Sequence, residues 1–91
     1  VPHVRDLVRF ERANLCVERE CDRVASGEPF DLILCRNVTI YFDEAAVRRI
    51  NDALVARLAP GGLLVLGVHE RLPPGDFGLE PAAGRLPVYR R

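Results

Sequence analysis

The chain of 91 residues is long enough for one small domain, although it is shorter than the usual domain of roughly 100–150 residues. Thirteen acidic residues balance thirteen basic residues, so we expect no nucleic-acid partner. No apolar run approaches the roughly 20 residues that span a bilayer, which argues against membrane insertion. The three cysteines lack the close pairing of a zinc site and follow no secretory leader, so we expect reduced thiols, no metal site and a cytoplasmic location.

The segment before residue 30 is expected to form a strand followed by a helix. Val8 and Phe10 alternate with charged residues, which predicts a short half-buried strand that ends near Asn14-Leu15. Apolar residues then recur at helical spacing over residues 17–25, and Ser26-Gly27-Glu28-Pro29 breaks this pattern. A short helix over residues 17–25 should therefore follow the strand.

Residues 31–66 carry the signals of a strand, a helix and a second strand. The run at residues 32–35 is apolar without alternation, which predicts a central parallel strand covered on both faces, and residues 63–66 form a second such run. Between them, Asp43 can cap a helix that runs to about Leu58 and that Pro60-Gly61-Gly62 ends. One apolar stripe of this helix should face the core: Val47, Ile50, Leu54 and Leu58. We therefore predict a right-handed crossover unit with two adjacent parallel strands.

The tail over residues 71–91 is rich in proline and glycine. Its only strand signals lie at residues 77–79 and 87–89. These two segments can form an antiparallel pair at the end of the chain.

Polar residues follow the expected strands at what should be one edge of the sheet. Arg36 and Asn37 follow the buried strand, Asn14 follows the first strand, and residues 68–70 follow the last parallel strand. In open parallel sheets, ligands bind outside the carboxyl ends of the strands, where helix N-termini present free N–H groups. This layout predicts a nucleotide-type cofactor site. The structural alternative is that Asn37 satisfies loop backbone groups and Arg36 pairs with Glu70.

Four stretches of the chain form a specific combination: VRFERANL at residues 8–15, FDLILCRNVTIYFDE at 30–44, LAPGGLLVLGVHE at 58–70, and PVYRR at 87–91. Together they resemble the carboxyl-terminal part of the CheR-type methyltransferases, S-adenosylmethionine-dependent enzymes that esterify glutamate side chains of bacterial chemoreceptors. The resemblance implies an α/β, Rossmann-like class I methyltransferase fold. Residues 1–91 would then be the C-terminal portion of the S-adenosylmethionine-binding domain, from strand 3 onward.

The resemblance also implies roles for individual residues. Asn14 and Leu15 would border the adenine of the cofactor, and Arg36, Asn37 and Val38 would form the loop under its adenosine and methionine portions. Tyr41 would lie close to the transferred methyl group. The catalytic candidates are therefore Arg36, which can orient a carboxylate, and Tyr41, whose aromatic face attracts a sulfonium.

The implied reaction is in-line displacement at the methyl group by a glutamate carboxylate of a chemoreceptor cytoplasmic domain or another protein. That carboxylate is already ionised at neutral pH, because its reference pKa is about 4.3, so no general base is required. His69 is more readily explained as a structural residue than as a base.

The chain departs from the family in several respects. It lacks the glycine-rich loop and the ribose-binding acidic residue, and residues 67–70 read Gly-Val-His-Glu where the family usually has Gly-His-Ser-Glu. It also starts at Val1 without an initiator Met, so we expect it to be a fragment. Because the glycine-rich loop and the ribose-binding acidic residue are absent, we expect this fragment to be inactive alone. The family's sheet order is 3-2-1-4-5-7-6, and a chain that begins at strand 3 would leave residues 32–34 as an uncovered apolar edge.

Two other functions remain open. One is a fragment of a class I methyltransferase that acts on a small molecule, since the crossover unit and the Pro-Gly-Gly turn are general features of such enzymes. The other is a non-catalytic interaction module that binds a partner through the edge at residues 32–34. Cofactor binding by the isolated chain would argue against the interaction module.

Overall fold

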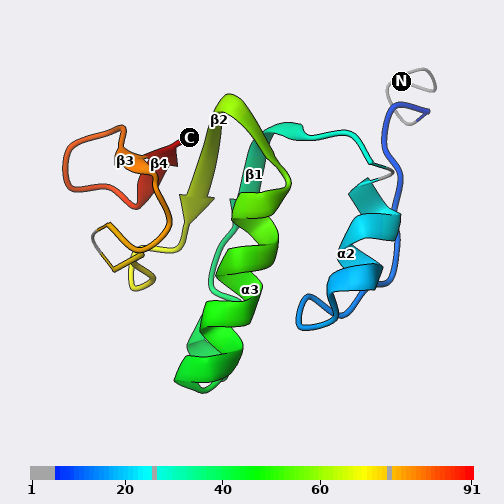
Figure 1. Cartoon of the computed structure of the whole chain (residues 1–91), viewed down its shortest axis with the longest axis horizontal. Helices are drawn as coiled ribbons and strands as arrows, with labels where there is room; N and C mark the ends of the chain where they lie inside the picture. Colours follow the sequence, from blue (N-terminus) through cyan, green and yellow to red (C-terminus); the bar gives the residue numbers. More distant parts are fainter. Residues whose placement is uncertain (1–5, 26, 74) are drawn as a thin grey trace.

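The computed structural model describes residues 6–25, 27–73 and 75–91 of the chain (Figure 1). Its elements are α2 (Glu18–Ala25), β1 (Phe30–Cys35), the short 3-10 helix η1 (Thr39–Tyr41), α3 (Glu44–Ala56), β2 (Leu58–Leu66), β3 (Glu80–Pro81) and β4 (Val88–Arg90). The predicted helix over residues 17–25 is therefore confirmed as α2. Ser26, the first residue of the predicted break after it, lies outside the described residues.

The four strands form one mixed sheet in the order β1-β2-β4-β3. β1 and β2 are parallel neighbours, with Leu32 opposite Leu63 and Cys35 opposite Leu66, and α3 connects them. β4 lies antiparallel to both β2 and β3. The strand-helix-strand unit is thus confirmed. The tail does form an antiparallel pair with its second predicted segment, but the predicted first segment at residues 77–79 is wrong, because the pairing strand is Glu80–Pro81.

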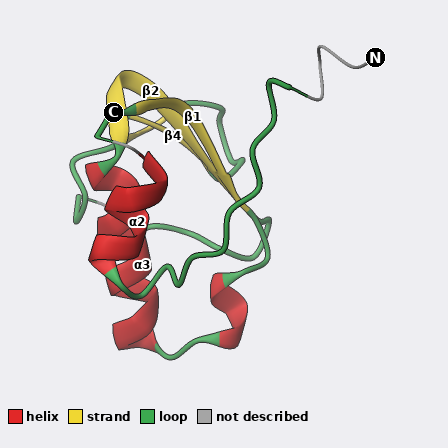
Figure 2. Ribbon diagram, turned by 90° about the vertical axis from the view of Figure 1, so that its right-hand side faces the viewer, coloured by secondary structure: helices red, strands yellow, loops and turns green. Residues whose placement is uncertain are grey.

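Helix α3 packs its apolar face onto the sheet. The Asp43 carboxylate accepts a hydrogen bond from the Ala46 amide at 2.8 Å and caps the helix as predicted. Ile50 and Leu54 on the expected stripe are buried in the core, which also includes Leu64 and Tyr89 from the strands. α2 lies on the same side of the sheet as α3 (Figure 2). α3 therefore covers one face of the sheet, and the other face is open.

The junction between α3 and β2 differs from the prediction. The helix ends at Ala56, and Leu58 is already the first residue of β2, because it pairs with Phe30 of β1. Pro60-Gly61-Gly62 consequently lies inside the strand, where the register with β1 shifts and Gly61 has a φ of 79°. The Pro-Gly-Gly sequence forms an irregularity in β2 instead of stopping the helix.

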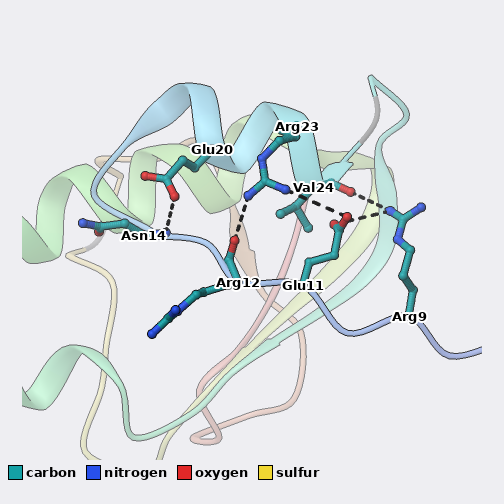
Figure 3. Close-up of polar contacts among 7 residues, drawn as sticks. All are labelled: Arg9, Glu11, Arg12, Asn14, Glu20, Arg23 and Val24. Atoms are coloured by element: carbon teal, nitrogen blue, oxygen red, sulfur yellow. Dashed lines mark hydrogen bonds and ion pairs between the residues drawn. The ribbon is translucent and has the colours of Figure 1, made fainter.

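The predicted strand at residues 8–11 is wrong. This segment is extended but has no strand partner in the described part of the chain, and the Phe10 side chain is 93% exposed. Polar contacts attach it to α2: the Arg9 guanidinium donates to the Val24 carbonyl at 3.1 Å, and Arg23 donates to the Arg12 carbonyl at 2.7 Å (Figure 3). Without a neighbouring strand, alternation of apolar and charged residues does not produce a sheet.

β1 lies at the edge of the sheet and is covered on one face only. Ile33 and Cys35 pack against the core, whereas Leu32 and Leu34 are 54% and 65% exposed on the other face. The expectation of a central strand covered on both faces is therefore wrong for this chain. The expected uncovered apolar edge at residues 32–34 is confirmed.

The helices of the described residues do not include one that is both long and apolar enough to cross a membrane.

Cys16, Cys21 and Cys35 are all free thiols. Burial raises the pKa of the Cys35 thiol, and the nearby Glu70 carboxylate raises it further. Cys35 is therefore held as an inert, protonated core residue.

Candidate functional site

The parallel pairing of β1 and β2 brings two chain segments together where these strands end. Cys35 and Leu66 are opposite each other in the last register pair, so the loop from Arg36 and the segment from Gly67 leave the sheet side by side. The loop from Arg36 continues through η1 into the start of α3. We call these two segments the strand-end loops.

The Glu70 carboxylate joins the two strand-end loops. The amides of Asn37, Val38 and Thr39 donate to it at 2.6, 3.2 and 2.8 Å, and the Gly67 amide donates at 2.8 Å. The Thr39 hydroxyl also donates to it through a very short hydrogen bond. Glu70 is only 5% exposed, so these donors replace the water that a carboxylate would otherwise need.

The backbone around this carboxylate is closely fitted. A Cβ on Gly67 would lie 2.5 Å from Asn37 Oδ1 and 2.9 Å from the Asn37 amide nitrogen, and closer still to Glu70 Oε1. Asn37 itself has a φ of 60°, in the left-handed region that asparagine tolerates better than most residues. Glycine at position 67 and asparagine at position 37 therefore let the loops approach Glu70.

These hydrogen bonds control the ionisation of Glu70. Burial alone would raise its pKa, but the hydrogen bonds from the Thr39 hydroxyl and from the amides of Asn37, Thr39 and Gly67 outweigh burial. Together they lower the pKa of Glu70 from 4.5 to about 2. The carboxylate is therefore ionised at any physiological pH.

The low pKa of Glu70 predicts an acid-sensitive fold. Because the pKa is lower in the folded chain than in the unfolded chain, the stabilisation is complete above pH 4.5 and is lost as the pH falls from 4.5 towards 2. The loss should reach about 3 kcal/mol, since each pKa unit corresponds to about 1.4 kcal/mol. Urea unfolding between pH 7 and pH 2.5 measures it.

Glu70→Gln is the comparison for that measurement, because it keeps the shape of the side chain and removes the titration. The variant should be less stable than the wild type at pH 7 and should lose much less stability in acid. Equal acid sensitivity of the two proteins would show that another carboxyl group controls the transition.

The predicted site residues Arg36, Asn37 and Tyr41 are on the strand-end loops and are exposed. Tyr41 is 82% exposed, while Val38 is half-buried against the core. Within the described residues, the side chains of Arg36, Asn37 and Tyr41 make no hydrogen bond or ion pair. Their polar groups are thus available to a ligand, whereas the backbone that carries them is fixed by Glu70.

Asn14 and Leu15 lie in a different environment. The Asn14 side chain accepts from the Cys16 amide at 2.9 Å, and the Asn14 amide donates to Glu20 at 3.2 Å, so this residue shapes the start of α2 (Figure 3). Leu15 packs beside α3, where it lines a hollow together with Cys16 and Asp52. The described contacts do not connect Asn14 or Leu15 to the Arg36 loop, and their predicted place beside the adenine stays a prediction.

The structural alternative for the polar residues is not supported. Glu70 binds amide groups and a hydroxyl, and the ion pairs of the described residues do not include one between it and Arg36. The side chain of Asn37 likewise satisfies no described loop backbone group.

The anchoring role of Glu70 was not predicted from the sequence. The available signal was the short spacing between Gly67 and Glu70 directly after a buried strand. His69 is exposed and lines a small hollow beside η1.

Comparisons with known proteins agree on one family. The family model described as "CheR methyltransferase, SAM binding domain" matches residues 1–83. Chemotaxis protein methyltransferase 2 of Pseudomonas aeruginosa is 43% identical over 70 residues, which is 77% of this chain and 24% of that protein. Chemotaxis protein methyltransferase of Listeria innocua is 38% identical over 80 residues, which is 87% of this chain and 28% of that protein.

The chain thus spans about a quarter of the length of these relatives. The family match extends over the strand-end loops, α2, α3 and β1 to β3. We conclude that the chain belongs to the CheR methyltransferase family and matches its S-adenosylmethionine-binding domain.

Proposed function

We propose that the protein containing this chain transfers methyl groups from S-adenosylmethionine to glutamate carboxylates of a protein, namely the cytoplasmic domain of a chemoreceptor. The observation that carries the proposal is the arrangement of the strand-end loop that begins at Arg36. Glu70 fixes its backbone while Arg36 and Tyr41 are exposed with no internal polar partner among the described residues. A binding site requires a fixed backbone that presents side chains able to contact a ligand, and this loop has both. A cytoplasmic location follows from that substrate.

We further propose that the chain is the C-terminal part of the methyltransferase domain. Two observations support this. The chain spans only about a quarter of its relatives. The order β1-β2-β4-β3, with β4 antiparallel to its neighbours, also corresponds to strands 4-5-7-6 of the family's sheet. The open side of β1 is then where the rest of the sheet would continue.

The residues present fit one side of the cofactor. The free side chains of Arg36 and Asn37 can hydrogen-bond its polar groups, and Val38 offers apolar contact at the same edge. The family's glycine-rich loop and ribose-binding acid are not in this sequence. We therefore propose that the isolated chain holds the cofactor too weakly for activity.

Bound S-adenosylmethionine supplies a methyl group on a positively charged sulfur. Arg36 can orient the substrate carboxylate through charge-assisted hydrogen bonds, and the Tyr41 ring can contact a cationic centre by its face. Glu70 holds the loop that carries both residues. Catalysis then rests on alignment, for which effective molarities of about 10⁵ M or more are the relevant scale.

The test is methyl transfer by a chimera in which residues 1–91 replace the matching segment of the P. aeruginosa relative. Arg36→Ala should slow the reaction by about ten- to a hundredfold, because it removes a charged donor worth roughly 1.5–3 kcal/mol. Tyr41→Phe should slow it by less than about tenfold, since the aromatic face remains. Rates are normalised to folded protein.

Arg85→Ala is the matched control, because Arg85 is an exposed arginine in the turn before β4 and its side chain makes no hydrogen bond or ion pair among the described residues. The substitution keeps the Arg85 carbonyl, which accepts from Arg71. It should leave the rate unchanged. Full activity of Arg36→Ala would show that the loop is only a scaffold, and an inactive chimera would contradict the proposed function.

The exposed edge of β1 favours one second candidate, a non-catalytic interaction module. Leu32 and Leu34 expose apolar surface next to unpaired backbone groups, which is a template for strand addition. Measurable methyl transfer by the chimera that is slowed in Arg36→Ala would exclude this candidate.

A further inference from the structure

A hollow of about 410 Å³ lies at the side of the molecule away from α2, between the segment that follows β2 and the strands β3 and β4 (Figure 1). Arg71 and Leu72 line it from the segment, and Pro81 and Tyr89 line it from the strands. We call it the tail hollow. Its volume is within the range of about 300–1,000 Å³ that is typical of small-molecule sites. None of the residues with a proposed role in methyl transfer lines it.

The Tyr89 side chain brings a hydroxyl group with an unused hydrogen to the tail hollow. Its oxygen accepts a hydrogen bond from the Leu72 amide at 3.2 Å, which places the hydroxyl group beside a second lining residue. Among the described residues, no acceptor binds the hydroxyl hydrogen, although Tyr89 is only 9% exposed. A buried tyrosine hydroxyl usually finds partners, and it can donate as well as accept. The Tyr89 hydroxyl is therefore available to donate to a ligand.

The Arg71 guanidinium supplies a positive charge with which no described carboxylate pairs. It donates to the Glu70 carbonyl at 3.4 Å and to the Arg85 carbonyl at 3.0 Å, so it lies between the segment after β2 and the turn before β4. A guanidinium carries more N–H donors than these two carbonyls use. The two contacts thus hold a charge with free N–H groups at the margin of the tail hollow.

The rest of the lining limits what these two donors can bind. Phe77 and Leu79 contribute apolar side chains, and the described lining residues do not include an acidic one. Two donors, one of them charged, favour an anionic acceptor, and a carboxylate matches the shape of a guanidinium. The apolar wall favours a hydrocarbon body over a sugar or a nucleotide. The lining therefore matches a small molecule that joins one carboxylate to an apolar group.

We propose that the tail hollow binds a small monocarboxylic acid with an apolar body. Its carboxylate accepts hydrogen bonds from the Arg71 guanidinium and the Tyr89 hydroxyl, and its apolar body contacts Phe77 and Leu79. The site is separate from the strand-end loop that begins at Arg36, so the inference goes beyond the proposed function and does not depend on it.

The test is a nuclear magnetic resonance titration of the ¹⁵N-labelled chain with 4-phenylbutyrate. The amide signals of Leu72, Phe77 and Tyr89 should shift. The alcohol 4-phenylbutan-1-ol keeps the apolar body without the charge, so it should bind about tenfold or more weakly. Acetyl-glutamate-amide keeps a carboxylate without the apolar body, and it should not shift these signals.

Arg71→Gln should weaken the binding of 4-phenylbutyrate by about ten- to a hundredfold, because it removes the charge at an exposed position. Arg90→Gln is the matched control, since Arg90 is an exposed arginine next to Tyr89 in β4 but does not line the tail hollow. It should bind as the wild type does. Tyr89→Phe keeps the ring and removes the hydroxyl group, so it should weaken binding by about three- to tenfold.

Three results would overturn the proposal. The first is the absence of any shift at the tail hollow with 4-phenylbutyrate. The second is equal affinity of the wild type and Arg71→Gln, which does not depend on the stability of Tyr89→Phe. The third is equal binding of the acid and the alcohol, which would show that the hollow takes up apolar groups without recognising a carboxylate.

Discussion

Glu70→Ala should lower the free energy of unfolding by about 4–5 kcal/mol, measured by urea denaturation at pH 7. The substitution leaves the amides of Asn37, Val38, Thr39 and Gly67 and the Thr39 hydroxyl without their acceptor. Each buried donor left unpaired costs about 1–3 kcal/mol, although water entering the space offsets part of this. A domain of this size is stabilised by only on the order of 5–10 kcal/mol, so most of the stability would be lost.

Glu80→Ala is the control for this experiment. Glu80 is an exposed glutamate in the two-residue strand β3, so its loss should change stability by less than about 0.5 kcal/mol. If Glu70→Ala unfolds at the same urea concentration as Glu80→Ala, the carboxylate does not anchor the two loops.

Gly67→Ala should lower the free energy of unfolding by about 3–4 kcal/mol. The added methyl group would lie 2.5 Å from Asn37 Oδ1 and 2.9 Å from the Asn37 amide nitrogen, so it would push the two strand-end loops apart. Overpacking of this kind costs about 1–3 kcal/mol, and the weakened hydrogen bonds to Glu70 add to it. Urea denaturation is again the measurement.

Gly75→Ala is the control for Gly67→Ala, because it measures the cost of backbone strain at a position where an added methyl group meets no other atom. A Cβ at Gly75 meets nothing within 4 Å, but its φ of 80° disfavours any side chain, so we expect a cost of only about 1 kcal/mol. The effects of Gly67→Ala and Glu70→Ala should also be less than additive in the double variant, because they disrupt the same contact. Full additivity would contradict a shared site.

The crossover unit could be predicted because its signals are local. A capping carboxylate at Asp43, an apolar stripe through Ile50 and Leu54, and two apolar runs specify a helix between two strands without reference to distant residues. Local patterns were insufficient where pairing depends on a distant partner. Alternation at Val8 and Phe10 produced no strand, because a strand forms only beside another strand.

The candidate site was predicted in part for the same reason. Polar residues that directly follow a buried strand could be placed at the sheet edge, and Arg36 and Asn37 do lie there. The contact that supports them was not predicted, because the hydrogen bond between the Asn37 amide and Glu70 joins residues 33 positions apart and the spacing of Glu70 from Gly67 does not identify its partner. An acidic side chain that binds backbone amides and a hydroxyl group leaves no complementary charge in the sequence to reveal its partners.

The two edge strands of the sheet, β3 and β1, differ in their capacity to pair with a further strand. β3 consists of Glu80 and Pro81, and a two-residue strand whose proline has no N–H offers almost nothing to a further strand. β1 is six residues long, proline-free and apolar on its open face. Additional strands, from the same polypeptide or from another, can therefore join only beside β1, and the tail terminates the sheet at the opposite side.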